Sequence, residues 1–190
     1  MPHLVEHLER YLGAISEGWS KDADGHRQHA QVVKFDDGPL DGVAAYSTLG
    51  LSRYELALPG KAPVRAELLM MVRRGHFERY VPSILQQLAE EMVHRGRAPL
   101  RGELIGPRGP LDPETRLEAF LVYSPYYQPD EFAVCEDANG PVIIVMLVPL
   151  FPEEASFAAT HGWKALESLL VEHDPDVDDW LRPPLPMHNH

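Results

Sequence analysis

The apolar run Val142–Val148 is the feature that most constrains how this chain can fold. It is the longest apolar run in the sequence, yet it is far shorter than the roughly 18 residues that a membrane-spanning helix requires. Asp137–Gly140 precedes it with the residue types of a hairpin turn, and Pro149 follows it. We therefore predict a strand in the interior of a sheet, buried on both faces.

Helical periodicity indicates three amphipathic helices. Their apolar positions recur within Leu4–Ile15, Phe77–Met92 and Trp163–His173. The first helix is expected to end near Gly18, and the second has a C-terminal stop at Gly96. A further short helix is expected to start at Glu153, where negative charge suits the helix dipole.

Segments with strand character occupy the intervals between these helices. They are Gln31–Phe35, Val43–Thr48, Val64–Val72, Ala119–Tyr123 and Phe132–Glu136. Helices and strands do not alternate as a doubly wound parallel sheet requires. We predict an α+β fold in which about three to four helices cover a mixed, largely antiparallel sheet. Residues 1–175 are expected to form one domain, and residues 176–190 an acidic, Pro-rich tail that is extended or partly disordered.

Composition limits the classes of partner. The 190 residues carry a net charge of −12, which repels nucleic acid, disfavours anionic membranes and favours a basic partner. A single cysteine excludes an internal disulfide framework. The N-terminus lacks the basic region of a signal peptide, so we expect a cytoplasmic protein.

The segment Tyr46–Ser52 is unusually rich in small and hydroxyl-bearing residues for a strand end. It has two interpretations, a ligand loop or a structural turn at Gly50, and the absence of a nucleophile, phosphate or metal pattern in the nearby sequence favours the structural turn. Arg65 and Glu67 lie two apart on a predicted strand, where they can pair with each other or clamp a partner. The candidate residues here are Tyr46, Ser47, Thr48, Gly50, Ser52, Arg65 and Glu67.

Patterns that would indicate catalysis are incomplete. The hydrolase elbow Gly-x-Ser-x-Gly and the glycine-rich phosphate loops do not occur. Cys135 stands beside Glu136, and a neighbouring carboxylate disfavours the thiolate form. His26 and His29 lie in or next to a polar loop, and we interpret them as surface residues. We therefore predict no catalytic residue, no metal site and no cofactor.

An acidic run near the C-terminus has two interpretations. It contains Glu172, Asp174, Asp176, Asp178 and Asp179. The alternation of oxygen ligands is that of a calcium loop, but the central glycine and the final glutamate are missing. The run is either a solvated turn or a contact patch for a basic partner.

Three groups of residues together carry a family resemblance. These are Tyr46–Ser52, then Arg65–Leu68, then Leu147–Leu150 with Glu153, Glu154 and Phe157. In this order they resemble the suppressor-of-fused-like domain family, over roughly Gly25 to Asp174. The resemblance implies a mixed α/β domain with a binding role and no catalysis.

The length resembles that of the compact, single-domain bacterial branch of this family. Animal members carry a second domain, for which 190 residues leave no room. The bacterial branch includes immunity proteins that neutralise a cognate toxin. The resemblance thus implies a non-catalytic, immunity-type protein, and the net charge of −12 favours a basic toxin, such as a nuclease, as its partner. The alternative is a small-molecule-binding domain or an uncharacterised enzyme with a cleft near Tyr46–Ser52.

Overall fold

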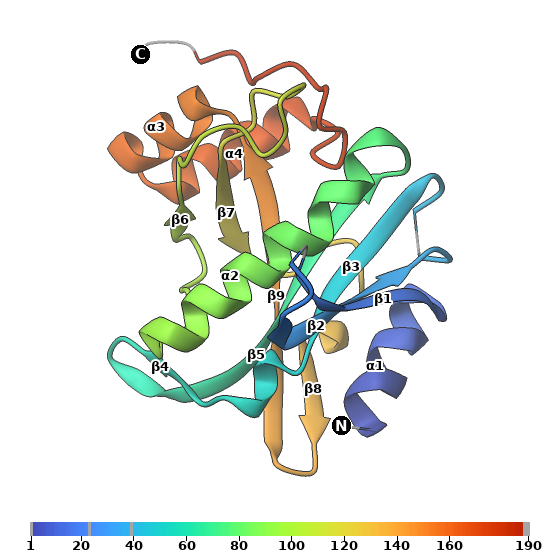
Figure 1. The fold of residues 1–190 in the computed structure, drawn as a ribbon. Helices are drawn as coiled ribbons and strands as arrows, with labels where there is room; N and C mark the ends of the chain where they lie inside the picture. The colour runs from blue at the N-terminus through green and yellow to red at the C-terminus, as the bar shows by residue number, and fades with distance from the viewer. Residues whose placement is uncertain (1, 23, 39, 188–190) are drawn as a thin grey trace. The chain divides into compact units, whose positions relative to one another are not determined.

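The computed structural model describes residues 2–22, 24–38 and 40–187 (Figure 1). The chain divides into two compact units. Unit 1 comprises Met1–Pro99 and Ser124–Met146, and unit 2 comprises Leu100–Tyr123 and Leu147–His190. Among the described residues, no helix has the length and apolar character needed to cross a membrane.

Unit 1 is built on a mixed sheet. Its strands are β1 (Ile15–Lys21), β2 (Arg27–Phe35), β3 (Val43–Leu49), β4 (Leu56–Leu58), β5 (Lys61–Arg73), β8 (Val134–Asp137) and the first part of β9 (Gly140–Leu150). The order is β1-β2-β3-β5-β9, with β4 paired to β5 and β8 paired to β9. Strands β5 and β9 run parallel, whereas the other ladders of this unit are antiparallel. The predicted α+β class is therefore confirmed, and β9 occupies the interior position expected for Val142–Val148.

Successive side chains of a strand point to opposite faces of the sheet. Both faces of this sheet are buried. Ala45 and Met71 belong to a core cluster that α1 (Pro2–Leu12) covers with its apolar stripe. Their neighbours Tyr46 and Met70 are also buried, on the face where α2 (Val81–Arg95) packs against β2 and β3 (Figure 1). Helix α2 ends at Gly96 in the left-handed conformation, as predicted.

The first helix is shorter than the sequence indicates. The predicted end near Gly18 is wrong, because α1 stops at Leu12 and β1 begins at Ile15. Gly13 causes the break: its φ is +86°, and a Cβ there would lie 2.8 Å from the Asp37 side chain. The apolar periodicity through Ile15 thus continues past the helix into a strand whose pairing with β2 decides its conformation.

Unit 2 combines a small sheet with two helices. Its elements are β6 (Leu104–Ile105), β7 (Ala119–Tyr123), the end of β9, α3 (Pro152–His161) and α4 (Trp163–His173). Strand β7 lies between β9 and β6 in the sheet order. Leu121, Leu150 and Leu166 are part of its core. The helix predicted to start at Glu153 is α3, which begins one residue earlier, at Pro152, and has Glu153 in its first turn.

The segment that follows α4 packs onto this core. Val177, Trp180 and Leu185 are each at most 6% exposed, and Val177 and Leu185 belong to the apolar cluster of unit 2. Residues 188–190, which end the predicted tail, lie outside the described residues. The domain boundary at residue 175 stays a prediction.

Candidate functional site

Glu67 is the centre of the motif that the sequence singled out. Its carboxylate is fully buried on β5 and accepts hydrogen bonds from the turn that follows β3. Oε1 accepts from the Gly50 amide at 2.8 Å and from the Ser52 hydroxyl and amide at 2.7 Å and 3.1 Å. Oε2 accepts from the Thr48 hydroxyl at 2.6 Å and the Leu51 amide at 3.3 Å. The side chain thus caps the short helix η1 (Leu51–Arg53), whose N-cap residue, Gly50, has a φ of +116°.

Thr48 connects this carboxylate to the backbone of β5. Its hydroxyl donates to Glu67 and accepts from the Leu68 amide at 2.8 Å. Burial raises the pKa of the Glu67 carboxyl, and the hydrogen bonds from Thr48, Ser52 and Gly50 oppose that rise. The donors and acceptors of the motif are used within it, which is the behaviour of a structural turn.

Arg65 holds the other end of the same turn. Its Nε donates to the Ser52 carbonyl oxygen at 2.6 Å and its Nη1 to the Gly140 carbonyl oxygen at 3.1 Å. The acidic group near it is Asp137, 3.7 Å away, so the anticipated pairing with Glu67 does not form. Arg65 and Glu67 are linked indirectly, because Glu67 accepts from the Ser52 amide and Arg65 donates to the Ser52 carbonyl oxygen.

Tyr46 and Ser47 have separate roles in the same strand. The Tyr46 hydroxyl donates to Glu78 at 3.2 Å, and burial raises the pKa of this phenol. The Ser47 hydroxyl donates to the Thr48 carbonyl oxygen. Both side chains are buried, so neither is available at the surface of the protein.

Glu154 forms a buried ion pair in unit 2. Its oxygens each lie 2.7 Å from a nitrogen of the Arg182 guanidinium, and both side chains are at most 5% exposed. The same carboxylate accepts from the amides of Phe151 and Leu185. The sequence marked Glu154 by family resemblance but gave no indication of Arg182, which lies 28 residues further along the chain.

The residues of the predicted acidic run differ in their exposure to solvent. Asp176 is exposed, and its carbonyl oxygen accepts from the Asp179 amide at 3.1 Å. The Asp179 carboxylate accepts from the Leu181 amide. Asp178 is only 2% exposed. The run therefore presents fewer carboxylates to solvent than its sequence implies.

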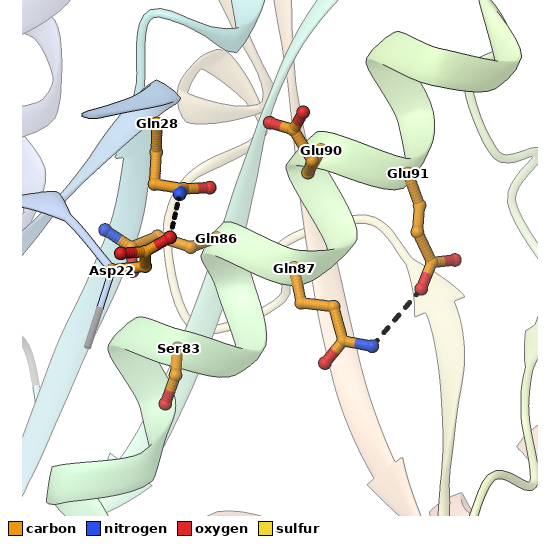
Figure 2. Close-up of a pocket in the computed structure, with 7 residues that line it drawn as sticks. All are labelled: Asp22, Gln28, Ser83, Gln86, Gln87, Glu90 and Glu91. Carbon is orange, nitrogen blue, oxygen red and sulfur yellow. Dashed lines mark hydrogen bonds between the residues drawn. The ribbon is translucent and has the colours of Figure 1, made fainter. Parts of the chain in front are cut away.

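An acidic groove in unit 1 was not predicted from the sequence (Figure 2). It has a volume of about 470 Å³ and lies between α2 and the turn that joins β1 to β2. Its lining residues are Asp22, Gln28, Ser83, Gln86, Gln87, Glu90 and Glu91. Three of them are carboxylates and none is cationic, so the groove favours positive charge, although Glu91 already pairs with Arg95 at 3.6 Å.

Amide side chains fix the two walls of this groove. Gln86 of α2 donates to the carbonyl oxygens of Trp19 and Lys21 at 3.3 Å and 3.2 Å, which ties the helix to the end of β1. Gln28 donates to the Asp22 carboxylate at 2.9 Å. Ser83, Gln87 and Glu90 follow helical spacing, so a polar stripe on α2 was the available sequence signal. Asp22, on the opposite wall, belongs to the turn between β1 and β2. No local sequence pattern predicts that this turn lies beside α2.

The mixed sheet of unit 1 and the helices of both units place the chain in the α+β class. The chain belongs to the suppressor of fused protein family, whose model matches residues 26–183. This match confirms the resemblance found in the sequence. It extends from β2 to beyond the buried residue Arg182.

One curated relative and several solved structures are similar to this chain. Immunity protein YqcF of Bacillus subtilis (strain 168) is 22% identical over 161 residues, which cover 84% of this chain and 83% of that protein. A suppressor of fused homolog from Neisseria gonorrhoeae FA 1090 aligns with a TM-score of 0.77 at 18% identity, covering 99% of this chain and 97% of that one.

Two further solved structures share the fold. A chain in the Sufu–Fu complex gives a TM-score of 0.71 at 14% identity, with 95% of this chain and 89% of that chain covered. Drosophila Suppressor of Fused gives 0.70 at 16% identity, with 99% and 50% covered, so the present chain spans half of that structure. At these identities the likeness concerns the fold.

Proposed function

We propose that this protein is a non-catalytic, protein-binding domain that acts as an immunity protein and neutralises a basic toxin. Membership of the suppressor of fused family is the observation that carries the proposal. YqcF, which is similar over most of both chains, is itself an immunity protein. In the Sufu–Fu complex, a protein of the same fold is found with a protein partner.

The charge distribution supports a basic partner. The chain carries a net charge of −12, and its acidic groove contains Asp22, Glu90 and Glu91 without a cationic residue. Complementary charge raises the association rate and rejects neutral or acidic partners. Lysine or arginine side chains of the toxin would enter this groove, and the bound domain would block the toxin sterically.

The polar motif around Glu67 has a supporting role in this proposal. Its hydrogen bonds are made within the motif, so it sets the path of the chain after β3 without offering its carboxylate to a partner. A small-molecule site at Tyr46–Ser52 would need polar groups directed at the ligand. The Thr48 and Ser52 hydroxyls donate to Glu67 instead, and the Tyr46 hydroxyl donates to Glu78.

The test is co-expression with a toxin encoded beside this chain. Protection of the host cells, together with binding of the two purified proteins, is expected. Absence of both protection and binding for every linked toxin would contradict the proposed function.

The groove has its own test within the same system. The triple variant Asp22→Asn/Glu90→Gln/Glu91→Gln removes three charges from the groove. The matched control Asp41→Asn/Glu131→Gln/Glu136→Gln removes three exposed charges elsewhere in unit 1. We expect the groove variant to associate more slowly than the control. If both variants bind equally well, the toxin contacts another surface and only the groove assignment fails.

A further inference from the structure

Three histidines lie next to carboxylates that line the acidic groove of unit 1. His29 Nδ1 on β2 lies 2.5 Å from Glu90 Oε2, and His94 Nδ1 on α2 lies 3.3 Å from Glu90 Oε1. Just before β2, His26 Nδ1 lies 3.6 Å from Asp22 Oδ2. We propose that protonation of these three imidazoles lowers the affinity of the groove for a basic partner. This inference rests on the proposed function and makes partner binding dependent on pH.

The charge of the groove explains this dependence. Histidine is the side chain that ordinarily changes from neutral to cationic as the pH falls from about 8 to 5. Each protonated imidazole places a positive charge next to a carboxylate that a lysine or arginine of the partner would contact, so the two cations compete for the same oxygens. The positive charge of three protonated imidazoles equals the negative charge of Asp22, Glu90 and Glu91, and the groove then no longer attracts a basic partner.

The positions of the histidines allow them to respond to the pH of the solvent. The side chains of His26, His29 and His94 are 78%, 41% and 73% exposed, so each ring exchanges protons with water. Helix α2 packs against β2, and this packing holds Glu90 beside His29. One oxygen of Glu90 faces the His29 ring and the other faces the His94 ring. Two of the three protonation events therefore act on the same carboxylate.

Other titratable and charged groups surround these histidines. They are Asp24 of the turn, Tyr54 after η1, Glu91 and Arg95 of α2, and Lys21 and Arg27, which face each other across the β1–β2 hairpin. The Tyr54 ring packs edge-on against His29, and Glu91 lies 3.6 Å from Arg95. Carboxylates, lysines, arginines and tyrosines ordinarily keep one charge state between about pH 5.5 and 7.5. In this part of the described structure, the histidines are therefore the groups that change charge over that range.

The test is a calorimetric titration of hexalysine into the full-length chain at low salt, at about pH 7.5 and about pH 5.5. Hexalysine contains no histidine, and its ammonium groups stay charged over this range. We expect a Kd roughly tenfold weaker at the lower pH, because each exposed charge contact contributes modestly. The histidine variant, His26→Gln/His29→Gln/His94→Gln, should bind equally well at both pH values, since glutamine stays neutral.

Proton release gives a second readout. Because hexalysine and protons compete for the groove, binding at about pH 6.5 should displace protons from the histidines. Titrations in two buffers of different ionisation enthalpy measure that release. The histidine variant should release fewer protons than the unsubstituted chain, whereas a purely structural role of the three histidines would produce no difference.

A matched control substitutes three exposed histidines of α1, α3 and α4, as His3→Gln/His161→Gln/His173→Gln. It should retain the pH dependence of the unsubstituted chain. The inference is overturned if hexalysine does not bind, if its Kd is the same at both pH values, or if the histidine variant keeps the dependence or the control loses it. If hexalysine behaves as expected but no linked toxin binds at any pH, the proposed function fails while the pH response of the groove stands.

Discussion

At the scale of single residues, the buried carboxylate of Glu67 organises the turn after β3. It accepts two hydroxyl and three amide hydrogen bonds, from Thr48, Gly50, Leu51 and Ser52. The sequence supplied these residue types and their likeness to a known family. It did not supply the pairing, because Glu67 lies on a different strand and 15 to 19 positions away from its hydroxyl partners. Residue types alone thus favoured a structural turn over a ligand loop, but they did not show that Glu67 is the acceptor for its hydroxyls.

Glu67→Gln tests this organisation. Each oxygen of Glu67 faces at least two donors, so the amide NH₂ of glutamine opposes donors in either orientation. Buried donors left without an acceptor cost about 1–3 kcal/mol each, so we expect a loss of about 3 kcal/mol in the free energy of unfolding. Urea denaturation measures it. The control Glu55→Gln, at an exposed position, should change stability by less than about 0.5 kcal/mol. Equal effects of the two substitutions would show that Glu67 does not organise the turn.

At the scale of elements, local patterns located most of the helices and strands but failed where distant contacts decide. Gly13 ends α1 because its backbone closely approaches Asp37. The periodicity through Ile15 could not show this, since the contact lies 24 positions away. The segment after α4 is similar: its proline and acidic residues are typical of a tail, yet Trp180 and Arg182 are buried because Glu154 and the core of unit 2 provide a place for them.

Arg182→Met tests what holds this segment to α3. The substitution leaves the buried Glu154 carboxylate without its cation, and breaking a buried pair in this way costs about 3–5 kcal/mol. The double variant Glu154→Met/Arg182→Met should recover part of that loss, because no buried charge remains unpaired. A double-mutant cycle by chemical denaturation gives the coupling. A loss below about 1 kcal/mol for Arg182→Met would mean that the ion pair is not what anchors the segment.

At the scale of the whole molecule, stability at low pH depends on which of the 29 acidic residues have perturbed pKa values. A hydrogen bond from Ser16 lowers the pKa of Asp36 from its ordinary value of 3.8, and Lys34 and Arg74 lower it further against the effect of burial. A lowered pKa in the folded state gives stability that is present above pH 3.8 and is lost as the pH falls through the folded value. This chain therefore carries an acid-sensitive contact between β1 and the residue that follows β2.

Asp36→Asn should weaken this acid dependence. We expect the variant to be less stable than the unsubstituted chain at neutral pH and to lose less stability as the pH falls below 4, because it has no proton to take up at this position. Asp41→Asn changes an exposed carboxylate nearby and should retain the full dependence. Thermal melts between pH 2.5 and 7 measure both. Parallel curves for the Asp36 variant and the unsubstituted chain would exclude Asp36 as a source of the acid sensitivity.

A destabilising substitution in one compact unit should accelerate hydrogen exchange mainly within that unit. Each has its own apolar cluster, although β9 passes from one into the other. Regions with separate cores open as partly independent cooperative units. In hydrogen exchange measured by mass spectrometry, Arg182→Met should accelerate exchange in β7 and α3 first, whereas Glu67→Gln should do so in β3 and β5. Glu55→Gln should leave both patterns unchanged. If either damaging substitution accelerated exchange equally throughout the described residues, the continuous strand β9 would be coupling the units into a single cooperative structure.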